Sequence, residues 1–244
     1  MRSPLGHLRR IIRRTGFRRM TVAGHEPPLT MSPEERDASI RKYRRHAAGY
    51  DRSAQRTMAL RRRVIDLLQL KPGDVVLDVG AGTGLSYEWL LQAVTPGGRV
   101  LAFEQSPDMF ALACARAHAR GWRTDGDSAP LWHVQASAQE VRLPCAPNAV
   151  LFHYTHDVLR SPAALANVLG QAQPGARVAV AGMKFFPWWT GPLNLFPWLK
   201  NRPYNARPGE LWTPWDRLQS WCEAWERRSV HAGMGYVAHG RLRG

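Results

Sequence analysis

One short segment, Val76–Gly84 (VLDVGAGTG), combines an acidic side chain with a run of glycines. An apolar stretch leads into it, and a predicted helix follows. Glycine permits positive φ and lets the backbone approach a ligand closely, and the N-terminus of a helix offers unpaired N–H groups. A dinucleotide fingerprint needs a third glycine at position 85, where this chain has Leu85. Asp78, two residues before the first glycine, would repel a pyrophosphate but suits a ligand that carries an ammonium group. The segment therefore predicts a ligand site that is not a dinucleotide site.

A second carboxylate, Glu104, stands twenty residues beyond Gly84, at the end of the next predicted strand. An acid at this place can accept hydrogen bonds from both ribose hydroxyls. A ligand with a ribose, an amino-acid ammonium group and no phosphate is S-adenosylmethionine. The two carboxylates and the glycines together therefore favour this cofactor, with S-adenosylhomocysteine as the product. Another kind of glycine-rich strand-to-helix turn is the alternative.

Strands and helices alternate from Asp74 onward, as the apolar runs and the Pro, Gly and Ser punctuation indicate. We expect strands at 75–77, 99–103, 131–136, 149–153 and 177–181, and helices at 86–93, 106–119 and 162–172. Two further helices, at 32–50 and 58–70, are expected before the first strand. Alternation at this spacing predicts a parallel sheet wrapped by helices on both faces, which is the α/β class.

Residues from about Tyr43 to Gly182 resemble a class I S-adenosylmethionine-dependent methyltransferase. The resemblance extends to the broad type 11 group that includes the ubiquinone/menaquinone C-methyltransferases. It rests on LDVGAGTG, the spaced Glu104, the VQASAQEVRLP stretch at 134–144 and the later PGAR turn. It implies a Rossmann-like, doubly wound, mostly parallel seven-stranded sheet with N-terminal helices and an aromatic-rich lid before the last hairpin. We accordingly expect a methyltransferase domain at 31–244.

The resemblance also assigns cofactor contacts. Asp78 would lie near the amino-acid end of the cofactor and Glu104 would bind its ribose. Backbone contacts are implied for Gly80, Ala81, Gly82 and Gly84. Further contacts are expected from Gln105, Met109, Ser137, Ala138, His153 and Tyr50. Ser137 stands where relatives usually have Asp, so its contact to the adenine would be weaker. The ring of Tyr50 could face the sulfonium, and ordinary packing is the alternative.

The predicted fourth strand ends in FHYTHD, at the edge of the sheet where ligands of this fold class bind. We assign Tyr154 and His156 as candidate catalytic residues, with His156 as a general base of near-neutral pKa. That His156 only caps the next helix or packs is an equal alternative. The N/D-P-P-Y signature of enzymes that methylate exocyclic amines is absent here. Its absence argues against a nucleic-acid base or a protein glutamine as the acceptor.

An aromatic stretch follows the fifth strand, and we assign an acceptor lid to 185–213. Seven of the ten Trp lie between 188 and 225, interleaved with prolines. The prolines predict no regular helix before Pro214, and the pattern then predicts a helix at 215–225 and a closing hairpin at 229–237. The residues best placed to meet an acceptor are Phe185, Phe186, Trp188 and Trp189. An apolar acceptor is favoured, and the alternative is that the tryptophans only seal a helical cap.

The net charge of +15 is concentrated at one end of the chain, since residues 1–63 hold 17 Lys and Arg against 5 Asp and Glu. The remaining residues hold 17 against 14. Because 30 of the 34 cations are Arg, bias of the coding sequence explains much of the excess, and we do not expect a nucleic-acid partner. Residues 1–30 are predicted to be a basic extension, flexible or amphipathic, and residues 1–20 are a candidate contact to an anionic membrane. A disordered tail and a translation start at Met31 are the other interpretations.

Three widely spaced cysteines exclude a disulfide framework and are typical of a reducing compartment, so we expect a cytoplasmic protein without a metal site. The predicted function is methyl transfer to a small lipophilic or aromatic acceptor. Two alternatives stay open at this point. One is a phospholipid headgroup N-methyltransferase at the membrane surface, and the other is an RNA-modifying or non-catalytic cofactor-binding protein.

Overall fold

The computed structural model describes residues 55–126, 128–186, 188–201 and 211–244. The helical elements are η1 (Gln55–Thr57), α2 (Met58–Leu67), α3 (Tyr87–Val94), α4 (Pro107–Ala119), α5 (His156–Arg160), α6 (Pro162–Leu169), η2 (Trp188–Asn194), α7 (Leu195–Asn201), α8 (Asp216–Trp221) and η4 (His231–Gly233). The strands are β1 (Val75–Val79), β2 (Arg99–Glu104), β3 (Leu131–Gln135), β4 (Ala149–His153), β5 (Arg177–Met183), β6 (Cys222–Val230) and β7 (Gly235–Leu242).

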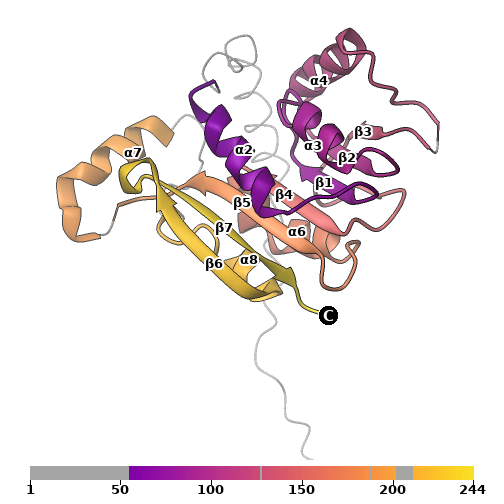
Figure 1. Cartoon of the computed structure of the whole chain (residues 1–244). Coiled ribbons are helices and arrows are strands. Elements are labelled where there is room, and N and C mark those ends of the chain that lie inside the picture. The colour runs from indigo at the N-terminus through magenta and orange to yellow at the C-terminus, as the bar shows by residue number, and fades with distance from the viewer. Residues whose placement is uncertain (1–54, 127, 187, 202–210) are drawn as a thin grey trace, which may run out of the picture.

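The seven strands form one sheet in the order β3-β2-β1-β4-β5-β7-β6 (Figure 1). The first five are parallel, and Val76 of β1 lies opposite Val100 of β2 and Ala149 of β4. β7 runs antiparallel to β5, and β6 antiparallel to β7. The strand order reverses between β1 and β4, which is where this fold class binds ligands. The predicted α/β, Rossmann-like, mostly parallel seven-stranded sheet is confirmed.

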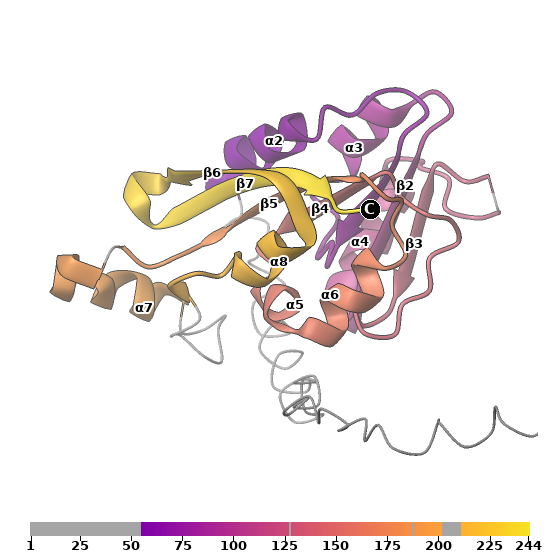
Figure 2. The same ribbon diagram turned by 90° about the horizontal axis from the view of Figure 1, so that it is seen from below.

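Helices cover both faces of the sheet, as Figure 2 shows in side view. One core joins α2, α3 and α4 to the sheet, and the other joins α5, α6 and α8 to its opposite face. Alternate residues of the central strands divide between the two cores, so Val76 lies in one and Leu77 in the other, both fully buried. Because both faces are buried, the central strands are continuous apolar runs rather than alternating ones.

Serine and proline together begin two of the helices. The Ser106 side chain accepts the backbone N–H of Met109 at 3.5 Å, and proline is the first residue of α4. Ser161 caps α6 in the same way, through the N–H of Ala164 at 3.2 Å. Serine at the N-cap and proline at the first helical position are both favoured, because the first N–H groups of a helix lack intrahelical partners.

The predicted strands of the parallel sheet are confirmed, each within two residues of its expected bounds. The helices expected at 86–93 and 106–119 are confirmed as α3 and α4. Those expected at 58–70 and 162–172 end three residues early, as α2 and α6. The helix expected at 32–50 and the extension at 1–30 lie outside the described residues.

Three expectations for the carboxyl-terminal part are wrong. The helix expected at 215–225 ends at Trp221, because Cys222 begins a long edge strand that pairs with β7. The hairpin is consequently larger than the expected 229–237. Regular helix also occurs before Pro214, as α7. Proline is tolerated there because Pro197 lies in the first turn, where N–H groups have no intrahelical acceptor.

Candidate cofactor and acceptor site

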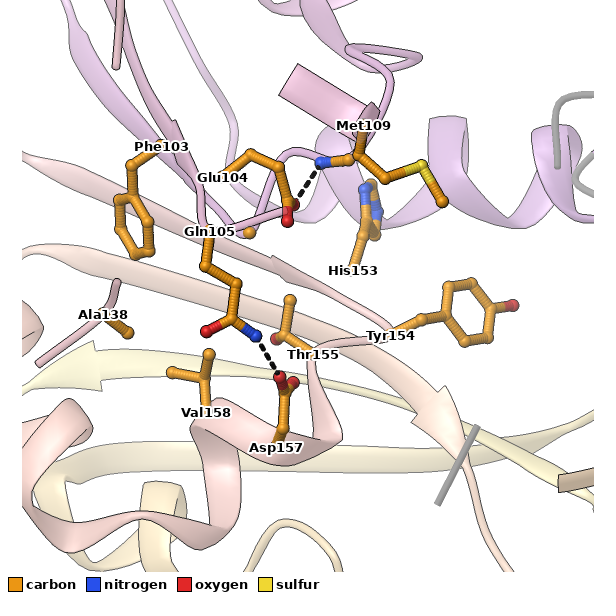
Figure 3. A pocket seen from close by; sticks show the side chains of 12 residues that line it. Phe103, Glu104, Gln105, Met109, Ala138, His153, Tyr154, Thr155, Asp157 and Val158 are labelled. Carbon is orange, nitrogen blue, oxygen red and sulfur yellow. Dashed lines mark hydrogen bonds between the residues drawn. The ribbon is translucent and has the colours of Figure 1, made fainter. Parts of the chain in front are cut away.

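A pocket opens at the carboxyl ends of β1, β2 and β4, where the strand order reverses (Figure 3). It is lined by Gly80, Gly82, Phe103, Glu104, Gln105, Met109, Ala138, His153, Tyr154, Thr155, Asp157 and Val158. Eight of these twelve residues were predicted from the sequence as site residues. The structure therefore brings together the glycine loop, the acid of β2 and the end of β4, which lie far apart in the sequence.

The glycines of the loop after β1 are needed for different reasons, although each has positive φ. At Gly82, nothing lies within 4 Å of the place that a Cβ would take, so the backbone stays open to a ligand. A Cβ at Gly80 would approach Thr155 to 2.9 Å, and one at Gly84 would approach the Tyr87 ring to 2.6 Å. Gly84, and also Ala81, do not line the pocket. Gly84 therefore serves packing, whereas Gly82 leaves room at the site.

Glu104 is anchored at the pocket floor by two backbone groups. The N–H of Gly82 donates to one carboxylate oxygen at 2.9 Å, and the N–H of Ser106 donates to the other at 2.8 Å. Burial raises the pKa of Glu104 to about 7 in spite of these bonds. Each carboxylate oxygen can accept a further hydrogen bond. The fixed carboxylate can therefore accept two hydroxyls of a ligand.

Asp78 lies under the loop, 1 % exposed, and does not line the pocket directly. Its Oδ2 has no hydrogen-bond partner among the described residues. Burial raises the pKa of Asp78 to about 7; nearby Arg61 lowers it and nearby Glu104 raises it. A buried carboxylate oxygen without a partner is costly in an otherwise satisfied fold. A cationic or hydrogen-bonding group of a ligand would supply the partner that this Asp78 oxygen lacks.

Two more buried polar atoms near the pocket have no partner among the described residues, His153 Nε2 and Thr155 Oγ1. The other ring nitrogen of His153 is 3.1 Å from Ser86 Oγ. Burial holds the pKa of His153 well below its usual range, so the ring is neutral. The pocket thus offers fixed carboxylates, a neutral imidazole and a hydroxyl to a polar ligand. This donor and acceptor set fits the ribose and amino-acid groups of S-adenosylmethionine.

A side-chain hydrogen bond spans the pocket, from Gln105 Nε2 to Asp157 Oδ2 at 3.2 Å (Figure 3). Asp157, like Thr155, was not predicted as a site residue. The FHYTHD string contains both, and only the fold shows that they line the pocket. Ala138 lines the same pocket, whereas Ser137 lines an adjoining one and donates to Glu140 at 2.7 Å.

The two residues predicted to be catalytic lie in different surroundings. Tyr154 lines the pocket with φ of +60°, a strained value for a residue with a bulky side chain. The Arg61 guanidinium carbon lies 5.5 Å from the centre of its ring. His156 does not line the pocket, and its Nε2 accepts the N–H of Met183 at 3.1 Å. Burial, with help from nearby Arg160, lowers the pKa of His156 to about 4.

The described part of the aromatic stretch divides into a packed and an exposed portion. Phe185 packs edge-on against Trp212 at 5.0 Å between ring centres, and Trp215 against Tyr236 at 4.9 Å. Trp189, by contrast, is 70 % exposed. Neither Phe185, Phe186 nor Trp189 lines the pocket, and Tyr50 lies outside the described residues. No cluster of three potential metal ligands occurs in the described part of the chain.

The sheet order, the glycine loop after β1 and the acid that ends β2 are the features expected of a class I S-adenosylmethionine-dependent methyltransferase domain. The cofactor of this class of domain is S-adenosylmethionine. Residues 76–175, which are 100 of the 244 residues, match the sequence profile of a family described as "Methyltransferase domain".

Comparison with individual proteins supports the same assignment. The chain is similar to a protein-L-isoaspartate O-methyltransferase of Aeropyrum pernix, with 44 % identity over 61 residues. That alignment spans 25 % of this chain and only 24 % of the relative.

Solved methyltransferases share the fold. A SAM-dependent methyltransferase from Aquifex aeolicus superposes with a TM-score of 0.54 at 20 % identity, over 75 % of this chain and 89 % of the other. An O-methyltransferase family protein from Burkholderia thailandensis gives 0.61 at 17 % identity, over 89 % and 64 %. The N-methyltransferase NodS from Bradyrhizobium japonicum, in complex with S-adenosylhomocysteine, gives 0.52 at 13 %, over 75 % and 86 %.

Proposed function

We propose that the protein transfers the methyl group of S-adenosylmethionine to a small lipophilic or aromatic acceptor. The observation that carries the proposal is the pocket itself. The pocket is lined by Glu104, whose carboxylate is held by backbone N–H groups, by the open backbone of Gly82 and by Tyr154, whose backbone is strained. Backbone strain is typically kept where it contributes to function.

The chain's own residues would bind and orient rather than react. Glu104 would accept the ribose hydroxyls, and Asp78 would face the ammonium end. Gln105 would contact the nucleoside once its bond to Asp157 rearranges. The cofactor supplies the activated methyl group. Most of the acceleration would then come from alignment of the acceptor and exclusion of water.

His156 is better suited to positioning than to proton abstraction. Its Nε2 already accepts a backbone bond from Met183, which fixes the remaining proton on Nδ1. The ring also lies beside Gly182, where a Cβ would be 2.9 Å from its Cε1. We therefore assign His156 to holding the end of β5 in place. Tyr154 remains the candidate to contact the acceptor.

The basis for an apolar acceptor is the aromatic stretch that follows β5, which exposes Trp189. Tyr236, which lies against Gly182 at the end of β5, and Trp215, which packs on Tyr236, are buried in the core and do not line the pocket. Aromatic rings bury large apolar area at low entropic cost. The similar proteins include both N- and O-methyltransferases, so the similarity does not indicate which acceptor atom is methylated.

The test is transfer of label from methyl-labelled S-adenosylmethionine to a panel of acceptors. The panel contains lipophilic phenols and quinols, phosphatidylethanolamine vesicles, transfer RNA and an isoaspartyl peptide. The proposal predicts label in the first group only, and its loss in Glu104→Gln. Glu88→Gln is the matched control, because Glu88 is an exposed carboxylate that pairs with Arg120 on the surface. Label in RNA, peptide or headgroup would contradict the proposed acceptor class, and no label in any arm would contradict the activity.

A further inference from the structure

The stretch from Phe185 to Leu199 carries no charged residue, although a fifth of the chain is charged. Nine of its fifteen residues are Phe, Trp or Leu. Its described part forms η2 and α7, which follow β5 directly. A stretch of this composition is normally buried in a core.

Instead, this segment presents apolar side chains outward. Trp189 is 70 % exposed, Leu193 62 %, Leu195 58 % and Leu199 53 %. These are the most exposed large apolar side chains among the described residues, and the next is below 45 %. Single exposed leucines are ordinary, but a concentrated set marks an interaction surface. We call residues 188–199 the apolar ridge.

The polar groups of the ridge are used internally. The Asn194 side chain accepts the N–H of Phe186 at 2.8 Å and donates to its carbonyl and to Thr190 Oγ1, each at 3.3 Å. Pro197 is buried on the inner side. The ridge is thus held in shape by its own hydrogen bonds while its outer side stays apolar.

Cationic groups lie beside the ridge. The turn after β6 contacts its base, since a Cβ at Gly233 would be 3.1 Å from the Phe186 ring. Figures 1 and 2 both show α7 and this turn at the same end of the molecule. The strand that leads to the turn exposes Arg227, which stacks on the Trp215 ring, and Arg228, which lies 4.0 Å from the carboxylate of Glu226. In the sequence, the ridge is followed by Lys200, Arg202 and Arg207, with Glu210 the one acid before Asp216.

We propose that the apolar ridge docks on an anionic lipid bilayer and inserts its outward Trp and Leu side chains into the interfacial layer. Tryptophan and leucine beside basic residues are typical of surfaces that bind lipid headgroups and the upper acyl chains. The fifteen uncharged residues are too few to span a bilayer, which takes about 20. No described helix is long and apolar enough to do so either.

This surface lies on the segment that continues from β5, whose neighbour β4 ends at the pocket. The ridge and the pocket therefore both lie beyond the carboxyl ends of parallel strands. Lipid docking is nevertheless independent of the proposed methyl transfer, and its measurement needs neither cofactor nor acceptor.

The experiment is flotation of the full chain with vesicles of phosphatidylcholine, alone or mixed with phosphatidylglycerol. The test variant carries Trp189→Ser, Leu193→Ser, Leu195→Ser and Leu199→Ser. The control is Leu112→Ser, because Leu112 is 41 % exposed on α4, away from the ridge. We expect binding that is stronger on the anionic vesicles, unchanged in the control and weakened at least about tenfold in the test variant. All four ridge side chains are exposed, so the variant should keep the thermal unfolding midpoint of the wild type.

Three results would overturn the proposal. One is no flotation of the full chain with either vesicle. Another is flotation that the ridge substitutions leave intact and that deletion of residues 1–30 removes, which would move lipid contact to the basic extension. The third is self-association in light scattering that the ridge substitutions abolish without changing lipid binding, because the ridge would then contact a second copy.

Discussion

Replacement of Asp78 by Asn tests the electrostatics of the site without any ligand. The carboxylate is buried with one unpartnered oxygen, and burial raises its pKa from the ordinary 3.8 to about 7. The unfolded chain therefore loses its proton at lower pH than the folded one. It follows that this group reduces the free energy of unfolding as pH rises from about 4 to 7, and that the full reduction is present above pH 7.

The size of the effect follows from the shift. About three pKa units at about 1.4 kcal/mol each give roughly 4 kcal/mol in total. Between pH 5 and pH 8 the part that changes is about 2–3 kcal/mol. Asn carries no charge at either pH, so Asp78→Asn should gain stability relative to the wild type by that amount between the two pH values. Any constant offset, from the amide group or from the altered surroundings of Arg61, cancels in this difference.

The assay is urea unfolding, followed by tryptophan fluorescence at pH 5 and pH 8, with m-values compared to confirm that the same transition is measured. Asp66→Asn is the matched control. Its carboxylate is 65 % exposed and pairs only loosely with Arg62 at 3.7 Å, so its effect should stay within about 0.5 kcal/mol at both pH values. An Asp78→Asn effect that is equal at the two pH values, or that falls toward pH 8, would show that the carboxylate is ionised and compensated, and would refute the reasoning.

Two further predictions concern the loop and the end of β5. Gly82→Ala should lower the affinity for S-adenosylhomocysteine and cost about 1 kcal/mol of stability, because only the positive φ is strained at this position. Gly84→Ala should cost more stability, because its Cβ would also meet the Tyr87 ring at 2.6 Å. Equal losses of stability for the two variants in chemical denaturation would contradict this distinction. His156→Ala should lose about 1–3 kcal/mol of stability, because the N–H of Met183 loses its acceptor. His156→Gln, whose amide can accept that bond, should recover part of the loss and leave the shape of the pH–rate profile unchanged. Disappearance of a titration near neutral pH from that profile would restore His156 as a general base.

The parts of the fold that local sequence dictates were predictable. β4 and β5 are apolar apart from one end residue each, and β1 is apolar apart from Asp78. The glycine loop and the serine–proline helix starts are set within a few residues. Glu104 could be placed in the site because its spacing from the loop is fixed by one helix and one strand.

The parts set by contacts distant in sequence were not predictable. β6 has mostly exposed residues on both sides and no alternating pattern, so only its pairing with β7 makes it a strand. The side chain of His156 turns away from the pocket because the N–H of Met183, 27 residues later, is its partner. Asp157 likewise has its hydrogen-bond partner far away in the sequence, because its side chain accepts a hydrogen bond from Gln105 across the pocket. Nothing local to either sequence position indicates these partners.

The central claim is that this pocket binds S-adenosylmethionine through Glu104, and calorimetric titration with S-adenosylhomocysteine at pH 8 tests it most directly. Glu104 is ionised there, and loss of its charged hydrogen bonds costs about 1.5–3 kcal/mol each. We expect saturable binding to the wild type and to Glu88→Gln, no binding of NAD, and an affinity at least about tenfold lower in Glu104→Gln. Equal affinity in Glu104→Gln and the wild type, or tighter binding of NAD, would contradict the account.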